Sequence, residues 1–196
     1  FSATTGYAVV AGKKKTHFDV SKKQKLTAQN VTEHIVVIPD TGGKIRVESV
    51  NKQYGHPEYR GIFEIDLVDK ALHIINELPL EEYLYSVVPS EMPTEYQKEA
   101  LKAQAVCART FAYGQMHNQA YAQYGANLDN TTAYQVYHAT TTYDVTDQAV
   151  QKGRLFLQKT KWQKPIFILF LQEFLPGLRR YGLRKKTEVI LCRACC

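Results

Sequence analysis

The spacing of apolar residues changes within one short stretch of this chain, and that change constrains the fold more than any other feature. In "IFEIDLV", residues 62–68, apolar side chains alternate with Glu64 and Asp66. A period of two residues is typical of a half-buried β-strand. The next apolar run, "ALHIIN" at residues 71–76, follows Asp69-Lys70 and is expected to pair back on this strand.

Directly afterwards the period becomes helical. The apolar residues now fall at i, i+3, i+4 and i+7, namely at Leu80, Tyr83, Leu84 and Val87. This spacing predicts a short amphipathic helix that opens near Pro79. We expect Pro89 to end it, because proline disfavours helical geometry in the residue before it.

A longer helix is predicted next. The stretch "TEYQ", which begins at Thr94, matches the Ser/Thr-x-x-Glu/Gln capping box. An alanine-rich segment of about 25 residues follows, with Gly125 as its expected stop. Its apolar stripe consists of Leu101, Ala105, Ala108 and Ala112. The two helices would form a helix–loop–helix corner, with Glu91 at its apex.

The remaining segments suggest strands and loops. Within residues 1–58, the β-branched runs "HIVVIPD" and "KIRVESV" flank Thr41-Gly42-Gly43, which predicts a hairpin. Residues 127–150 are rich in Thr and Tyr, and "TDQAV" at 146–150 can start another helix. The predicted fold class is therefore α+β: mixed β-strands, a helix–loop–helix corner and one long Ala-rich helix.

The positive net charge of +6 is confined to the end of the chain. Residues 1–150 carry 14 Lys and Arg against 17 Asp and Glu, whereas residues 151–196 carry 11 against 2. A basic tail without a recognition motif gives no support to nucleic-acid binding. The longest apolar run, "IFILFL", is far shorter than the roughly 18 residues that span a bilayer, and no membrane anchor is visible.

No residue pattern indicates a metal or another cofactor. The histidines at 56, 73, 117 and 138 are scattered and none lies near a cysteine, so the spacing of a zinc site is missing. Cys107 lies within the alanine-rich helix, where we expect a small buried hydrophobe. The tyrosines between residues 113 and 143 are equally compatible with stacking on sugars or bases and with ordinary strand positions.

Glu91 is the first candidate for chemistry. It lies between Pro89 and Pro93 in "VVPSEMP", so its backbone is restricted on both sides. It is either an ordinary loop or capping carboxylate, or a catalytic acid. A catalytic acid needs a raised pKa, which packing of the carboxyl against Val87, Val88 and Met92 could provide.

Lys102 and Arg109 are candidates for binding. They are seven residues apart, which puts them on nearly the same helical face about 10 Å apart. One interpretation is a solvated face with a single ion pair between Glu99 and Lys102. The other is a polar strip that lines a groove and offers donors to an oxygen-rich ligand.

A longer stretch of sequence narrows these alternatives. Residues 78–113, "LPLEEYLYSVVPSEMPTEYQKEALKAQAVCARTFAY", closely resemble the signature of the SpoIID domain family, which contains the stage II sporulation protein D and the amidase-enhancer proteins. Weaker agreement extends back to Tyr59-Arg60-Gly61 and forward through Gln135-Val136-Tyr137. The resemblance therefore covers roughly residues 59–150.

The resemblance implies a lytic transglycosylase of bacterial peptidoglycan. Such an enzyme cuts peptide-free glycan strands between N-acetylmuramic acid and N-acetylglucosamine, and leaves a 1,6-anhydro product. It also implies that Glu91 is the catalytic acid and base, and that Lys102 and Arg109 bind the substrate. The alternatives are a non-catalytic wall-binding enhancer of an N-acetylmuramoyl-L-alanine amidase, which would be its partner, and an inactive truncated family member.

The sequence also departs from the family. Some members hold a structural zinc with Cys and His near this point, but "LDNTTAYQVYHA" has no cysteine, so we expect no metal. The serine-rich motif expected after "TDQAV" is absent, and we interpret residues 151–196 as a basic tail produced by a frameshift near Lys152. The expected organisation is a β-leaning part at 1–58, a catalytic domain at 59–150 that is incomplete at its C-terminal side, and this tail. The resemblance implies an extracytoplasmic location.

Overall fold

The computed structural model describes residues 1–51, 55–117, 121–122, 125–130, 133–139 and 143–153, and the backbone of 166–170. The strands are β1 (Ser2–Ala3), β2 (Tyr7–Ala11), β3 (Lys14–Phe18), β4 (Ile35–Pro39), β5 (Ile45–Arg46), β6 (Glu58–Tyr59), β7 (Ile62–Val68), β8 (Ala71–Pro79), β9 (Leu128–Asp129) and β10 (Ile166–Phe170). The helices are α1 (Leu80–Glu91), α2 (Lys98–Gln115) and α3 (Asp144–Lys152). The predicted α+β class is confirmed.

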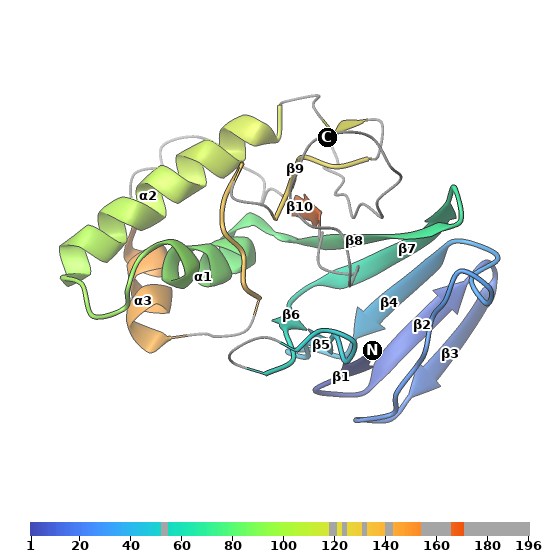
Figure 1. The fold of residues 1–196 in the computed structure, drawn as a ribbon. Coiled ribbons are helices and arrows are strands. Elements are labelled where there is room, and N and C mark those ends of the chain that lie inside the picture. The colour runs from blue at the N-terminus through green and yellow to red at the C-terminus, as the bar shows by residue number, and fades with distance from the viewer. Residues whose placement is uncertain are drawn as a thin grey trace.

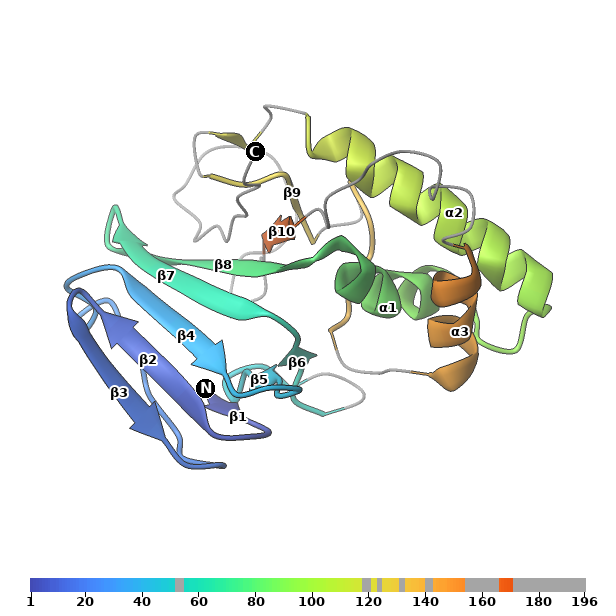
Figure 2. The ribbon, with the colours of Figure 1, turned by 180° about the vertical axis from the view of Figure 1, so that it is seen from behind.

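The strands and the helices occupy different parts of the molecule. One sheet has the order β3-β2-β4-β7-β8-β10-β9, and a smaller one has the order β1-β5-β6. Helix α1 continues directly from the end of β8, and α2 and α3 lie against it beyond the sheets (Figures 1 and 2). This placement leaves α1 as the element that connects the strands to the helices.

The predicted β7–β8 hairpin is confirmed. The strands are antiparallel, with Val68 opposite Ala71. Asp69 and Lys70 both adopt positive φ, 52° and 67°, which is the geometry of the tight two-residue turn that matches the twist of paired strands. On β7, Phe63 and Ile65 are buried as the alternation predicts, whereas Leu67, the third apolar residue of the pattern, is exposed near the turn.

The predicted hairpin around residues 41–43 is wrong. Gly43 N–H does donate to the carbonyl oxygen of Asp40 at 2.8 Å, so a turn forms there. However, β4 is already paired with β2 on one side and β7 on the other, and has no open edge for β5. The chain therefore crosses to the smaller sheet, where β5 pairs with β1 and β6.

Pro89 does not end α1. The helix continues to Glu91, with Pro89 inside it. Proline removes its own N–H from the helical ladder and its ring crowds the carbonyl of the preceding turn, yet the next turn still closes because Met92 N–H donates to Val88 O at 3.1 Å. Val87 and Val88 are fully buried, so their packing stabilises a helical conformation that proline alone disfavours.

The second helix is shorter than predicted. Thr94 is not its cap: Tyr96 N–H donates to Pro93 O in a turn, and the 18-residue α2 begins after Gln97. The helix ends at Gln115, and Gly125 lies in a later turn with φ of 78°. All four residues of the predicted apolar stripe are buried, and so the face of α2 was predicted correctly although its ends were not.

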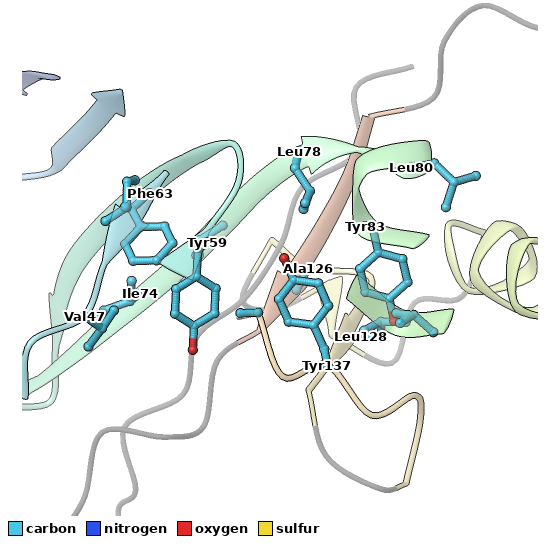
Figure 3. Close-up of a cluster of buried hydrophobic side chains, with 14 of the residues drawn as sticks. Val47, Tyr59, Phe63, Ile74, Leu78, Leu80, Tyr83, Ala126, Leu128 and Tyr137 are labelled. Carbon is cyan, nitrogen blue, oxygen red and sulfur yellow. The ribbon is translucent and has the colours of Figure 1, made fainter. Parts of the chain in front are cut away.

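Three stacked tyrosines join the strands to the helices within the core. The ring of Tyr137 lies 6.1 Å from that of Tyr59 on β6 and 5.3 Å from that of Tyr83 on α1, measured between ring centroids. Figure 3 shows the three rings in a row. All three side chains are almost completely buried. The segment around Tyr137 is thereby fixed between the sheets and α1.

Candidate active site

Glu91 is the last residue of α1 and its side chain is exposed. Val87 and Val88, which the sequence offered as apolar neighbours for this carboxyl group, lie in the core, whereas Glu91 lies on the surface. Instead, Glu91 Oε1 accepts a hydrogen bond from the backbone N–H of Val136 at 2.5 Å. The carboxylate is therefore positioned by a backbone donor and remains open to solvent.

The segment 135–139 packs along the second half of α1. His138 N–H donates to Ser90 Oγ at 3.2 Å, and Ser90 Oγ donates in turn to Ser86 O at 2.6 Å. Gln135 accepts a bond from Tyr83 Oη at 3.2 Å and donates to Ala108 O at 3.4 Å. This extended segment thus contacts both α1 and α2 on either side of the stacked Tyr137.

Sequence reasoning did not assign a role to Ser90, Val136 or His138. Ser90 stands beside Glu91 in the quoted signature, and residues 135–137 were part of the weaker resemblance. The family resemblance of residues 135–137 was the available sequence signal that this segment contacts the signature around Glu91. Every residue except proline has a backbone N–H, so the residue type of Val136 could not show that its N–H is the donor to Glu91.

Arg109 lies inside the protein, and only 1% of its surface is exposed. Its Nε and Nη2 donate to the two carboxylate oxygens of Glu81 on α1, at 2.8 and 2.9 Å. Further N–H groups donate to Val150 O at 2.9 Å, to Gly153 O at 3.4 Å and to Ala105 O at 3.3 Å. This guanidinium links α1, α2 and the end of α3, and does not line a surface groove.

Lys102 lies nearer the surface of the same helix. Its Nζ is 2.5 Å from Glu99 Oε1, the i, i+3 ion pair that the sequence suggested. Cys107 is exposed, so the prediction that it is buried is wrong. The apolar stripe of α2 explains this result, because Cys107 lies two residues beyond Ala105 and therefore on the opposite side of the helix.

A cavity of about 450 Å³ lies elsewhere, between the turn that follows β4, the start of β7 and the middle of α1. Arg60 and Lys44 line it, and Arg60 Cζ is 5.5 Å from the ring centroid of Tyr85. Burial lowers the pKa of Lys44, and the positive charge of Arg60 lowers it further. Glu91 does not line this cavity.

Within the described residues, no group of three or more His, Cys, Asp or Glu side chains is arranged to hold a metal ion. No helix in the same part of the chain has the length and apolar character needed to cross a membrane.

Comparison with known proteins identifies the family of this region. The family model described as "Stage II sporulation protein", SpoIID, matches residues 68–157, which is just under half of the chain. That match contains the whole of α1, α2 and α3. This segment is therefore SpoIID-family sequence, as the resemblance predicts. No solved structure matches significantly.

Several curated proteins are similar to this segment. A stage II sporulation protein D from Bacillus amyloliquefaciens is 46% identical over 105 residues, which cover 45% of this chain and 30% of that protein. The protein of the same name from Bacillus subtilis is 46% identical over 65 residues, 32% of this chain and 19% of that protein. An amidase enhancer from Bacillus subtilis is 38% identical over 71 residues, 36% of this chain and 9% of that protein. The chain thus spans less than a third of the length of these relatives.

Proposed function

We propose that this protein acts on the bacterial cell wall as a peptidoglycan lytic transglycosylase, with Glu91 as its acid and base. The SpoIID match supports a cell-wall role, because it covers the complete α1–α2 corner that carries Glu91. Since the proposed substrate lies outside the cytoplasmic membrane, the proposal includes an extracytoplasmic location.

The observation that carries this proposal is the setting of Glu91. One carboxylate oxygen is held by the N–H of Val136, and the side chain is exposed at the end of a helix. Among the described residues, the second oxygen has no hydrogen-bond partner. A carboxyl group held on one side and open on the other can be approached by a glycosidic oxygen.

The proposed reaction needs a single carboxyl group. Neutral Glu91 donates its proton to the glycosidic oxygen, and the C1–O bond breaks as the N-acetylglucosamine hydroxyl departs. The resulting carboxylate then takes the proton of the muramic acid's C6 hydroxyl, whose oxygen bonds to C1 and closes the 1,6-anhydro ring. The substrate supplies the nucleophile, so the second carboxylate of an ordinary glycosidase is unnecessary.

The two cations of α2 have different roles in this proposal. Lys102 is accessible enough to donate to a sugar oxygen once it leaves Glu99, an exchange that an exposed pair permits. Arg109 has its donors committed to Glu81 and to main-chain carbonyls. We therefore assign Arg109 a supporting role, in which it holds the start of α1 and thereby positions Glu91.

The test is to incubate the protein with peptide-free glycan strands and to search for anhydro-muramyl products by mass spectrometry. We expect products from the wild type and none from Glu91→Gln, because an amide cannot donate the required proton. Glu95→Gln is the matched control, since Glu95 is also an exposed acid, in the loop directly after α1. Equal product from the wild type and Glu91→Gln would remove Glu91 from the mechanism.

A second candidate function rests on the similarity to the amidase enhancer. In that case the protein binds the wall without cleaving glycan and stimulates a separate N-acetylmuramoyl-L-alanine amidase. Stimulation of such an amidase, with no anhydro product from any variant, would favour this role. Absence of both effects would indicate an inactive member of the family.

A further inference from the structure

The cavity beside Arg60 forms a second candidate site, which we name the Arg60 cavity. Its lining residues come from three parts of the chain: Pro39, Asp40, Thr41, Gly42, Gly43 and Lys44; Arg60, Gly61 and Ile62; and Glu82 and Tyr85. Its volume of about 450 Å³ lies in the usual range of small-molecule sites. Tyr85 precedes Glu91 by six residues on α1, about 9 Å along the axis and on a different side, so the two sites are distinct.

The cavity is lined by two cations that no carboxylate neutralises at close range. Among the described residues, neither Lys44 nor Arg60 has a carboxylate within ion-pair distance. The charges of Glu58 and Asp147 act on Lys44 from farther away, and Asp147 also acts on Arg60; Asp147 Oδ1 is buried without a hydrogen-bond partner among the described residues. Two like charges in a half-buried setting repel each other, and an anion placed between them would remove that repulsion.

The lining also carries two carboxylates, those of Asp40 and Glu82, and in the described part of the chain neither forms an ion pair with Lys44 or Arg60. Asp40 already contacts His17, with both carboxylate oxygens 3.1 Å from Nε2 of that ring. Glu82 makes no ion pair within the described part of the chain, so it can accept a hydrogen bond from a ligand hydroxyl. The site therefore combines donors for an anion, an acceptor for hydroxyl groups and the aromatic ring of Tyr85.

The backbone that carries these groups is held in place. Asn76 Nδ2 donates to Arg60 O at 2.8 Å and to Ile62 O at 3.1 Å, from a fully buried position on β8. On the opposite wall, Asp40 N–H donates to Gly6 O at 2.8 Å. A site with fixed walls loses less conformational entropy on binding than a flexible one.

We propose that the Arg60 cavity binds an anionic amino sugar, with the ligand carboxylate between Lys44 and Arg60, the sugar ring against Tyr85 and a hydroxyl donating to Glu82. This inference rests on the proposed function, since a glycan strand stripped of peptides exposes the lactyl carboxylate of each muramic acid. The cavity would recognise such a strand away from the bond that Glu91 cuts. N-acetylglucosamine, which has no carboxylate, would be a poor ligand.

The test is calorimetric titration of the full chain with four probes: N-acetylmuramic acid, N-acetylglucosamine, D-lactate and inorganic phosphate. We expect N-acetylmuramic acid to bind at least about tenfold more tightly than each of the others, because it alone combines a carboxylate for Lys44 and Arg60 with a sugar ring for Tyr85 and a hydroxyl for Glu82. Arg60→Gln and Lys44→Gln should each weaken its binding by about tenfold or more. Glu91→Gln should leave that binding unchanged.

The control variant is Lys14→Gln, which removes the same charge from an exposed position on β3. Urea unfolding of every variant verifies folding, and Lys44→Gln gives a second test if Arg60→Gln does not fold. Equal binding of all four probes, or tightest binding of phosphate or lactate, would overturn the proposal. The proposal would also be overturned if Lys14→Gln weakened the binding of N-acetylmuramic acid as much as Arg60→Gln does. The same holds if Glu91→Gln were the one variant that weakened this binding.

The binding result is separable from the glycan-cleavage result. Anhydro products without binding of N-acetylmuramic acid would refute the Arg60 cavity and leave the transglycosylase standing. Binding that depends on Arg60 and Lys44, without any anhydro product, would support the cavity and count against the transglycosylase.

Discussion

Arg109 illustrates how one side chain can determine the arrangement of several elements. The guanidinium group offers five N–H donors in a planar fork, and this geometry suits a carboxylate approached edge-on. Glu81 fills that fork, and the carbonyls at the end of α3 take the remaining donors. A lysine has a single charged nitrogen and could not reach all of these acceptors at once.

We predict that Arg109→Met lowers the free energy of unfolding by about 3 kcal/mol or more, because it leaves Glu81 and buried carbonyls without their donors. Lys102→Met is the control on the same helix, and should cost at most about 1 kcal/mol because its ion pair is exposed. Urea unfolding measures both. Similar losses for the two variants would contradict the structural role assigned to Arg109.

The sequence identified Lys102 and Arg109 as a pair because seven residues is almost two helical turns. That spacing could not show that one residue is buried and the other accessible. The difference arises from Val150 and Gly153, more than 40 residues farther along the chain, which cover Arg109. Whether the carboxyl group of Glu91 is exposed or packed against apolar neighbours could not be decided from the sequence for a similar reason, because the position of α1 relative to the sheet is a long-range property.

At the level of elements, the approach of β7 to β8 depends on a glycine. Gly61 immediately precedes β7 and has φ of 80°, a region that side chains with a Cβ rarely adopt. A Cβ at this position would also collide with the carbonyl oxygen of Glu77 on β8. The glycine therefore permits both the turn into β7 and its close pairing with β8.

We predict that Gly61→Ala destabilises the protein by about 2 kcal/mol or more, through positive φ and the collision with β8. Gly114→Ala is the matched control, because Gly114 lies in α2 and a Cβ added there would meet open space. That change should stabilise the protein by about 0.5–1 kcal/mol, as alanine is the better helix former. Thermal unfolding of both variants provides the measurement, and a stable Gly61→Ala protein would contradict the argument.

Local pattern predicted the existence of the main elements better than their ends. The alternation of residues 62–68 and the helical spacing from Leu80 depend on neighbours in sequence, and both elements form. The end of α1 and the start of α2 depend on packing and on a turn at Pro93, and both were predicted wrongly. The proposed tail at 151–196 lies largely outside the described residues and stays a prediction.

For the molecule as a whole, stability should decrease from the centre of the large sheet towards its β3 edge. β4 is paired on both sides, whereas β3 is paired only with β2 and consists mainly of exposed residues. The stacked tyrosines connect β6 of the smaller sheet to α1 (Figure 3), and Tyr59 of this stack also contacts Phe63 on β7 of the large sheet, with ring centroids 5.3 Å apart. Edge strands open more readily than central strands because fewer contacts must break.

We predict that the hydrogen-bonded amides of β4 exchange with deuterium at least about tenfold more slowly than those of β3. Hydrogen exchange followed by mass spectrometry measures this difference on the intact chain. Amides of β7 that bond to β8 serve as the reference for a strand paired on both sides. Equal protection of β3 and β4 would show that the large sheet opens as one unit.

By itself, the sequence determined the β7–β8 hairpin, two helices with a corner between them, and the place of Glu91 at that corner. These features follow from the spacing of apolar residues and from tight-turn chemistry, which act between near neighbours. Tertiary structure decided which sheet β5 joins, that Arg109 is enclosed while Cys107 is exposed, and that Val136 meets Glu91 across 45 residues. Periodicity specifies which face of an element is apolar, but the partner that covers that face depends on how distant segments pack.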